Sequence, residues 1–111
     1  MIYEIRNYHF DPDLFDDYKA WINNHAGVYL ARELDLVGFW AGDENEVTGA
    51  DMDELGSANI TWIIRWPDRA TRDEQMGKVF TSDEWGEIFK HVPGGIDSYK
   101  RMEAKFTESL I

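Results

Sequence analysis

The chain contains no cysteine and few basic residues. Without cysteine there is no disulfide framework and no thiol chemistry. Only 11 lysines and arginines stand against 22 aspartates and glutamates, and the net charge of −11 argues against nucleic acid or an anionic membrane as a partner. The sequence has no pattern of a secretory leader and no apolar run that approaches the roughly 20 residues of a membrane span. We therefore expect a cytoplasmic protein.

Several motifs that carry chemistry are also missing. The sequence has no P-loop, no dinucleotide-binding fingerprint, no serine-nucleophile elbow and no zinc signature. His9, His25 and His91 are too far apart to form a metal-binding motif. The acidic stretch 43–57 lacks the order of ligands that an EF-hand requires, which favours a solvated loop over a calcium site. We expect no metal and no cofactor.

Aromatic residues, by contrast, are abundant. Five Trp, five Tyr and six Phe occur in 111 residues, a length typical of one domain covering 1–111. A domain of this size buries only about two thirds of the surface of its unfolded chain. The aromatic surplus therefore suggests a cavity for a small apolar or aromatic ligand, a subunit interface, or both.

The order of the predicted elements indicates a ferredoxin-like α+β fold. Strands are predicted at residues 2–9, 36–42, 58–66 and 96–106. Asp11 and Pro12 open a helix that should run to about residue 32, and Thr71 with Glu74 forms a possible capping box for a second helix. Ser82 and Asp83 start a further short helix. The β-α-β-β-α-β order predicts a four-stranded antiparallel sheet with helices on one face.

The predicted sheet has apolar residues on both faces. Trp62, Ile64 and Trp66 share one face of the third strand, whereas Ile63 lies on the other. Helices on one face alone would leave an exposed hydrophobic patch in a monomer. We therefore predict a homodimer that packs sheet against sheet.

Three motifs resemble the NIPSNAP family. Residues 3–8, with Pro12 and Phe15, are similar to its opening motif, and residues 36–40 resemble its second strand. Trp66 and the residues around it, together with 83–85, resemble its third strand and second helical region. This resemblance covers about residues 3–89 and implies a dimeric α+β barrel, in which the sheets of two ferredoxin-like protomers face each other.

At one position the chain also resembles the haem-degrading monooxygenases, another branch of the dimeric α+β barrel superfamily. Asn7 matches the asparagine of their first strand, but Phe89 stands where their haem-ligating histidine would be, and His91 is two residues away. We therefore do not expect haem. The resemblance leaves open a cofactor-independent monooxygenase of the kind that acts on electron-rich polyketide phenols.

Polar residues on the first strand allow two interpretations. Glu4, Arg6 and Tyr8 alternate on one face. With Arg65 they are candidates for the interior of a barrel shared by two subunits, where they would orient a ligand. Alternatively, they form an ion-pair network that stabilises the dimer, because buried charges must be paired.

His25 is the candidate catalytic residue. It follows Trp21 and Ile22 on the apolar stripe of the first helix, and as a general base it would face the cleft between sheet and helix. The alternative is a histidine of the core bonded to the backbone. The predicted ligand-binding residues are Asn7, Tyr8, Trp40, Trp62, Arg65 and Trp66. Each tryptophan suits a pocket wall or the core equally well.

Two functions of different class remain. The first is a small enzyme without a cofactor, an isomerase, cyclase or monooxygenase that acts on an aromatic or polyketide-like metabolite. The second is a non-catalytic module that binds a small molecule or another protein.

Overall fold

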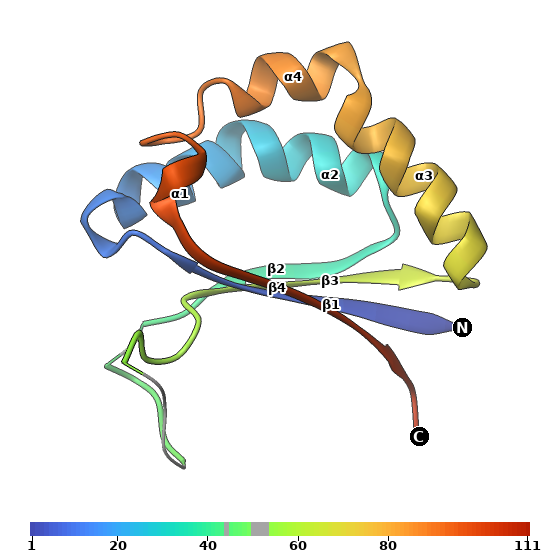
Figure 1. Ribbon diagram of the computed structural model, residues 1–111, viewed down its shortest axis with the longest axis horizontal. Helices are drawn as coiled ribbons and strands as arrows, with labels where there is room; N and C mark the ends of the chain where they lie inside the picture. The colour runs from blue at the N-terminus through green and yellow to red at the C-terminus, as the bar shows by residue number, and fades with distance from the viewer. Residues whose placement is uncertain (44, 50–53) are drawn as a thin grey trace.

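The protein folds as a four-stranded antiparallel sheet that carries its helices on one face (Figure 1). The structure is a computed structural model that describes residues 1–43, 45–49 and 54–111. Residues 44 and 50–53, part of the predicted acidic loop, lie outside the described residues. The elements are, in chain order, β1 (Ile2–Phe10), α1 (Phe15–Trp21), α2 (Gly27–Glu33), β2 (Leu36–Ala41), β3 (Ile60–Trp66), α3 (Arg69–Thr81), α4 (Asp83–Phe89) and β4 (Tyr99–Glu108).

The strand order β2-β3-β1-β4 confirms the predicted ferredoxin-like fold. β1 lies in the centre and pairs antiparallel with both β3 and β4. The fourth strand was predicted from residue 96, but Ile96–Ser98 forms a 3-10 turn after Gly95, whose φ is 75°. β4 therefore begins at Tyr99.

The first helical segment has the predicted extent but is not uniform. The Asp11 side chain accepts a hydrogen bond from the backbone N–H of Asp13, and the segment ends at Glu33. Between α1 and α2 the backbone forms a π-helical turn at Ile22–Ala26. Gly27 comes directly after this turn, and its backbone lies close to the first residue of the turn. A Cβ atom at position 27 would lie only 2.6 Å from the Ile22 carbonyl oxygen. The wider turn thus depends on glycine at this position.

The second helical region begins earlier than predicted. Asp68, rather than Thr71, caps α3, because its side chain accepts a hydrogen bond from the backbone N–H of Thr71. Ser82 separates α3 from α4 and caps α4 through the backbone N–H of Trp85. The predicted start of a further helix at Ser82–Asp83 is confirmed.

The core lies between the sheet and the helices. Phe10 of β1 stacks on Tyr18 of α1 with ring centroids 3.7 Å apart, and Ile60 and Ile64 of β3 are fully buried. On the helix-free face, Tyr3, Ile5 and Ile63 are only half-buried. Within the described residues, no helix has the length and apolar character needed to cross a membrane.

Candidate functional site

A pocket of about 250 Å³ lies between the sheet and the helices. Aromatic rings form most of its wall, and a guanidinium and three tyrosine hydroxyls are its polar groups. The residues that line it are Arg6, Tyr8, Tyr18, Ile22, Leu30, Phe39, Trp62, Phe80, Trp85, Phe89, Tyr99 and Met102. Such a combination of apolar walls with a few convergent polar groups is typical of a small-molecule site.

The aromatic side chains that line the pocket pack against one another. Phe39 of β2 stacks on Trp62 of β3 with centroids 5.1 Å apart, and Trp85 stacks on Phe89 within α4 at 5.6 Å. Tyr99 meets Tyr8 edge to face at 5.5 Å. Because the rings come from the sheet and from α4, the wall is fixed by the tertiary fold itself.

Arg6 is the cationic group of the pocket. Its Nε donates a hydrogen bond to the Tyr8 hydroxyl at 2.7 Å, and its guanidinium lies 5.2 Å from the Trp62 ring centroid. The Arg6 side chain is 13% exposed. A guanidinium placed over an indole and bonded to a hydroxyl is held in one orientation, which suits it to directing its remaining N–H groups at a ligand.

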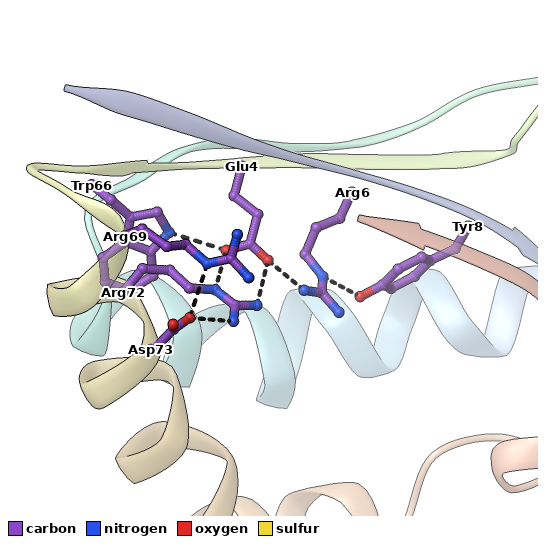
Figure 2. A network of polar contacts seen from close by, with 7 residues as sticks. All are labelled: Glu4, Arg6, Tyr8, Trp66, Arg69, Arg72 and Asp73. Carbon is purple, nitrogen blue, oxygen red and sulfur yellow. Dashed lines mark hydrogen bonds and ion pairs between the residues drawn. The ribbon is translucent and has the colours of Figure 1, made fainter. Parts of the chain in front are cut away.

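Glu4 anchors Arg6 from the side away from Tyr8, as Figure 2 shows. Its carboxylate is fully buried and accepts hydrogen bonds from Arg6, from the Trp66 indole at 3.1 Å and from Arg72 of α3. Arg72 binds it with two nitrogens, each at 2.9 Å, and also contacts Asp73. A buried carboxylate with this many donors is stabilised in its charged form.

These contacts determine the ionisation state of Glu4. Burial alone would raise the pKa of its carboxyl, but the hydrogen bonds and charges of Arg72 and Arg6 outweigh that effect and lower the pKa below its ordinary value. Glu4 is therefore ionised at neutral pH and fixes the position of both arginines.

The tyrosines stay neutral. Burial raises the pKa of Tyr8, and the charge and hydrogen bond of Arg6 only partly offset the increase. Burial likewise raises the pKa of Tyr99 to about 12 and that of Tyr18 further still. The hydroxyls of Tyr18 and Tyr99 lie 3.0 Å apart and share one hydrogen bond. At neutral pH these groups donate and accept hydrogen bonds but do not serve as anions.

Two predicted ligand-binding residues, Tyr8 and Trp62, line this pocket. The predicted barrel-interior position of Glu4, Arg6 and Tyr8 is wrong, because these side chains face the helices and not the helix-free face (Figure 2). The alternative is confirmed in part: Glu4 and Arg6 form an ion pair within one chain, with Arg72 as the further partner. That this network stabilises a dimer stays a prediction.

Four other predicted ligand-binding residues lie elsewhere. Asn7 is on the helix-free face, where its side-chain oxygen accepts a hydrogen bond from Thr61 at 2.7 Å. Trp40, opposite Thr61, is 48% exposed on the same face. Arg65 is exposed and pairs with Asp35 at 2.9 Å, whereas Trp66 is buried against Glu4. Only two of the six predicted ligand-binding residues therefore line the pocket, which lies on one face of the sheet.

His25, the predicted catalytic residue, does not face the cleft between sheet and helices. It belongs to the π-helical turn and is exposed. Its side chain borders surface grooves together with Trp21, Asn24 and His91. The widened turn rotates the helix relative to a regular α-helix, so that Ala26 instead of His25 is buried.

The surface grooves are larger than the pocket, but their walls are less suited to hold a ligand. The groove beside His25 measures about 440 Å³, and another between Asp13, Asp43 and Asn59 measures about 540 Å³. Exposed charged and polar side chains line much of both. The pocket beside Arg6 is smaller, yet aromatic rings form most of its wall and its polar groups converge.

Sequence reasoning missed Tyr18 and Tyr99. Alternation from Met102 places Tyr99 on the helix-free face, but the register of β1 and β4 shifts between His9 and Phe10, so that Tyr99 pairs with Phe10. This bulge turns Tyr99 towards Tyr18. Within residues 1–43, 45–49 and 54–111, no cluster of three His, Cys, Asp or Glu side chains is arranged to hold a metal ion.

The fold closely matches solved structures of the family that the sequence resembles. An uncharacterised NIPSNAP domain protein from Burkholderia xenovorans superposes with a TM-score of 0.75, covering 98% of this chain and 94% of that chain at 14% identity. The chain has the fold of NIPSNAP domain proteins. A NIPSNAP family protein of unknown function from Agrobacterium tumefaciens gives a TM-score of 0.72 over 96% of this chain and 86% of that chain, at 18% identity.

The NIPSNAP fold extends to a further group of structures. A Bacteroides thetaiotaomicron protein named as a candidate antibiotic biosynthesis monooxygenase matches with a TM-score of 0.61, over 99% of this chain and 90% of that chain, at 13% identity. No family model matches the sequence, and a search of curated proteins finds no match. The predicted NIPSNAP-like fold is confirmed, and at these identities the likeness is one of fold.

Proposed function

We propose that this protein binds a flat aromatic or polyketide-like small molecule in the pocket between its sheet and its helices. The observation that carries the proposal is the convergence of Arg6 and three tyrosine hydroxyls in a pocket walled by aromatic rings. The volume of about 250 Å³ suits a molecule of two or three fused rings. The rings in the wall offer stacking and edge contacts to such a molecule.

The lining also bears on the two functions that the sequence left open. Among the described residues it contains no carboxylate and no imidazole, and its tyrosines are neutral. An isomerase or cyclase that relies on a protein base to remove a proton therefore has little support. Arg6 favours a second candidate function, an enzyme without a cofactor that stabilises negative charge on the oxygen of an electron-rich substrate. Cofactor-independent oxygenation of a phenol is a reaction of this kind.

A homodimer and a cytoplasmic location form part of the proposal. The helix-free face supports the dimer, because it presents Ile5, Ile63 and the exposed Trp40. A dimer mass in light scattering at micromolar concentration is the expected result, and a monomer mass would contradict it.

Calorimetric titration with two-ring aromatic probes tests ligand binding. A probe of about a dozen non-hydrogen atoms that gains about 0.3 kcal/mol or more per atom should bind with a Kd of roughly 1 mM or tighter. The Met102→Trp variant should weaken this binding, since Met102 lines the pocket and its 47% exposure leaves room for a larger side chain.

Val28→Trp is the matched control. Val28 is 58% exposed and borders the groove beside His25 instead of the pocket. If the probes bind in the proposed pocket, this variant should bind them like the wild type. Weaker binding by Val28→Trp together with unchanged binding by Met102→Trp would place the ligand in the surface groove and refute the proposal.

A further inference from the structure

We propose that the ligand of the aromatic pocket carries an anionic oxygen head group, a carboxylate or phenolate, that Arg6 binds directly. This inference rests on the proposed function and adds to it the chemical class of the ligand. It follows from the unused donors of Arg6, the charge balance around it, and the donors that surround it.

Two nitrogens of the Arg6 guanidinium are anchored within the protein. A guanidinium has five N–H donors. In the described structure, Nε donates to Tyr8 and Nη1 to Glu4, while Nη2 has no hydrogen-bond partner. Figure 2 shows this third nitrogen on the side that faces the helices, where the pocket lies. Two anchored nitrogens and one free amino group make a positioned binding group for an oxygen anion.

The charged side chains around Arg6 also favour an anionic ligand. Three arginines, Arg6, Arg69 and Arg72, share two carboxylates, Glu4 and Asp73, so the network keeps one formal positive charge. Arg72 takes both oxygens of Glu4, whereas Arg6 has a single contact with that carboxylate.

The surplus positive charge is therefore shared between the two ends of the network, Arg6 and the exposed Arg69, and only Arg6 borders the pocket. Among the described residues that line the pocket, none carries a carboxylate that could neutralise Arg6. The net charge of −11 resides mostly on exposed side chains, whose field is screened beyond about 8 Å at physiological salt.

The polar groups beside Arg6 also offer protons to a ligand. The Tyr8 hydroxyl accepts from Arg6, which leaves its own proton for a ligand. One hydroxyl of the Tyr18–Tyr99 pair donates to the other, so one proton of that pair is also available. The indole N–H of Trp62 lies near Tyr8, but it is buried and has no partner of acceptable geometry among the described residues. Several donors beside one cation complement an anionic oxygen better than a neutral one.

A pair of probes with the same shape but different charge tests the inference. We would compare 2-naphthoate with 2-naphthamide by calorimetry at neutral pH, using the full-length wild type. Charge-assisted hydrogen bonds predict that the naphthoate binds about tenfold tighter or more. The Arg6→Gln variant should lose this preference while still binding the amide, and Arg6→Lys should restore part of it.

Arg72→Gln is the matched control. It removes one arginine from the same carboxylate, but Arg72 does not line the pocket, so the preference for naphthoate should remain. Circular dichroism checks that each variant is folded. If Arg6→Gln does not fold, two measurements still test the role of Arg6. They are the ratio of the wild-type affinities for naphthoate and naphthamide, and the same ratio in Arg6→Lys.

The outcomes separate the two proposals. Equal affinity of wild type for naphthoate and naphthamide would overturn the anionic head group and leave the aromatic pocket standing. A naphthoate preference that survives in Arg6→Gln would overturn the role of Arg6. If wild type binds neither probe, the proposed function itself fails.

Discussion

Replacing Glu4 by glutamine should strongly destabilise the protein. The carboxylate is fully buried and is the common partner of Arg6 and Arg72, whose side chains are only 13% and 20% exposed. Glutamine keeps one oxygen acceptor but removes the negative charge, which leaves the largely buried Arg6 without a charged partner and Arg72 with Asp73 alone. Removing one partner of a buried ion pair costs about 3–5 kcal/mol, and we expect the lower end because the arginines retain some contact with water.

Urea denaturation measures this change. A loss of about 3 kcal/mol in the free energy of unfolding corresponds to a fall in Tm of roughly 10 °C for a domain of this size. The matched control is Asp35→Asn, which makes the same acid-to-amide change in the exposed pair with Arg65. That pair is solvated, so the control should unfold nearly like the wild type.

The difference between wild type and Glu4→Gln should also depend on pH. Since the pKa of Glu4 is lowered in the folded state, its contribution is fully present above the ordinary carboxyl pKa of 4.5 and is lost as the pH falls through the folded-state pKa. The two proteins should thus converge in stability under strongly acidic conditions. A difference below about 1 kcal/mol at neutral pH, or one that does not shrink in acid, would refute the reasoning.

Two further predictions concern the helices. Gly27→Ala should destabilise the protein, because its Cβ would lie 2.6 Å from the Ile22 carbonyl oxygen, whereas Gly77→Ala, which meets open space in α3, should stabilise it by about 0.5–1 kcal/mol. Thermal unfolding of the two variants measures both shifts, and shifts of the same sign would contradict the account of the π-helical turn. Tyr29→Phe should cost about 1–3 kcal/mol, because it removes the buried hydrogen bond of 2.8 Å to the Val79 carbonyl. An unchanged urea midpoint would show that this bond contributes little.

The fold could be predicted from the sequence because its signals are local. Asp11 and Pro12 mark a helix start, and residues 60–66 alternate so clearly that Trp62, Ile64 and Trp66 all fall on the buried face. The sequence reasoning erred in choosing which face of the first strand meets the helices. One interpretation placed Glu4 and Arg6 in the interior of a barrel shared by two subunits, whereas both side chains face the helices. Their partner Arg72 is 68 residues from Glu4, so local patterns could not reveal it.

The candidate site was less predictable for two physical reasons. The π-helical turn at Ile22–Ala26 carries His25 to the surface, and a regular helical period cannot anticipate that change. The bulge between β1 and β4 turns Tyr99 into the pocket, against simple alternation. Both irregular features border the pocket. Local departures from regular structure are often found at functional sites.

The indole N–H signals of the five tryptophans test directly whether the aromatic pocket is the ligand site. Nuclear magnetic resonance spectra recorded during a titration with 2-naphthoate should show large shifts for Trp62 and Trp85, which line the pocket. The signal of Trp40, on the helix-free face, should stay in place. Shifts confined to Trp21, which borders the groove beside His25, or no shifts at all, would contradict the account.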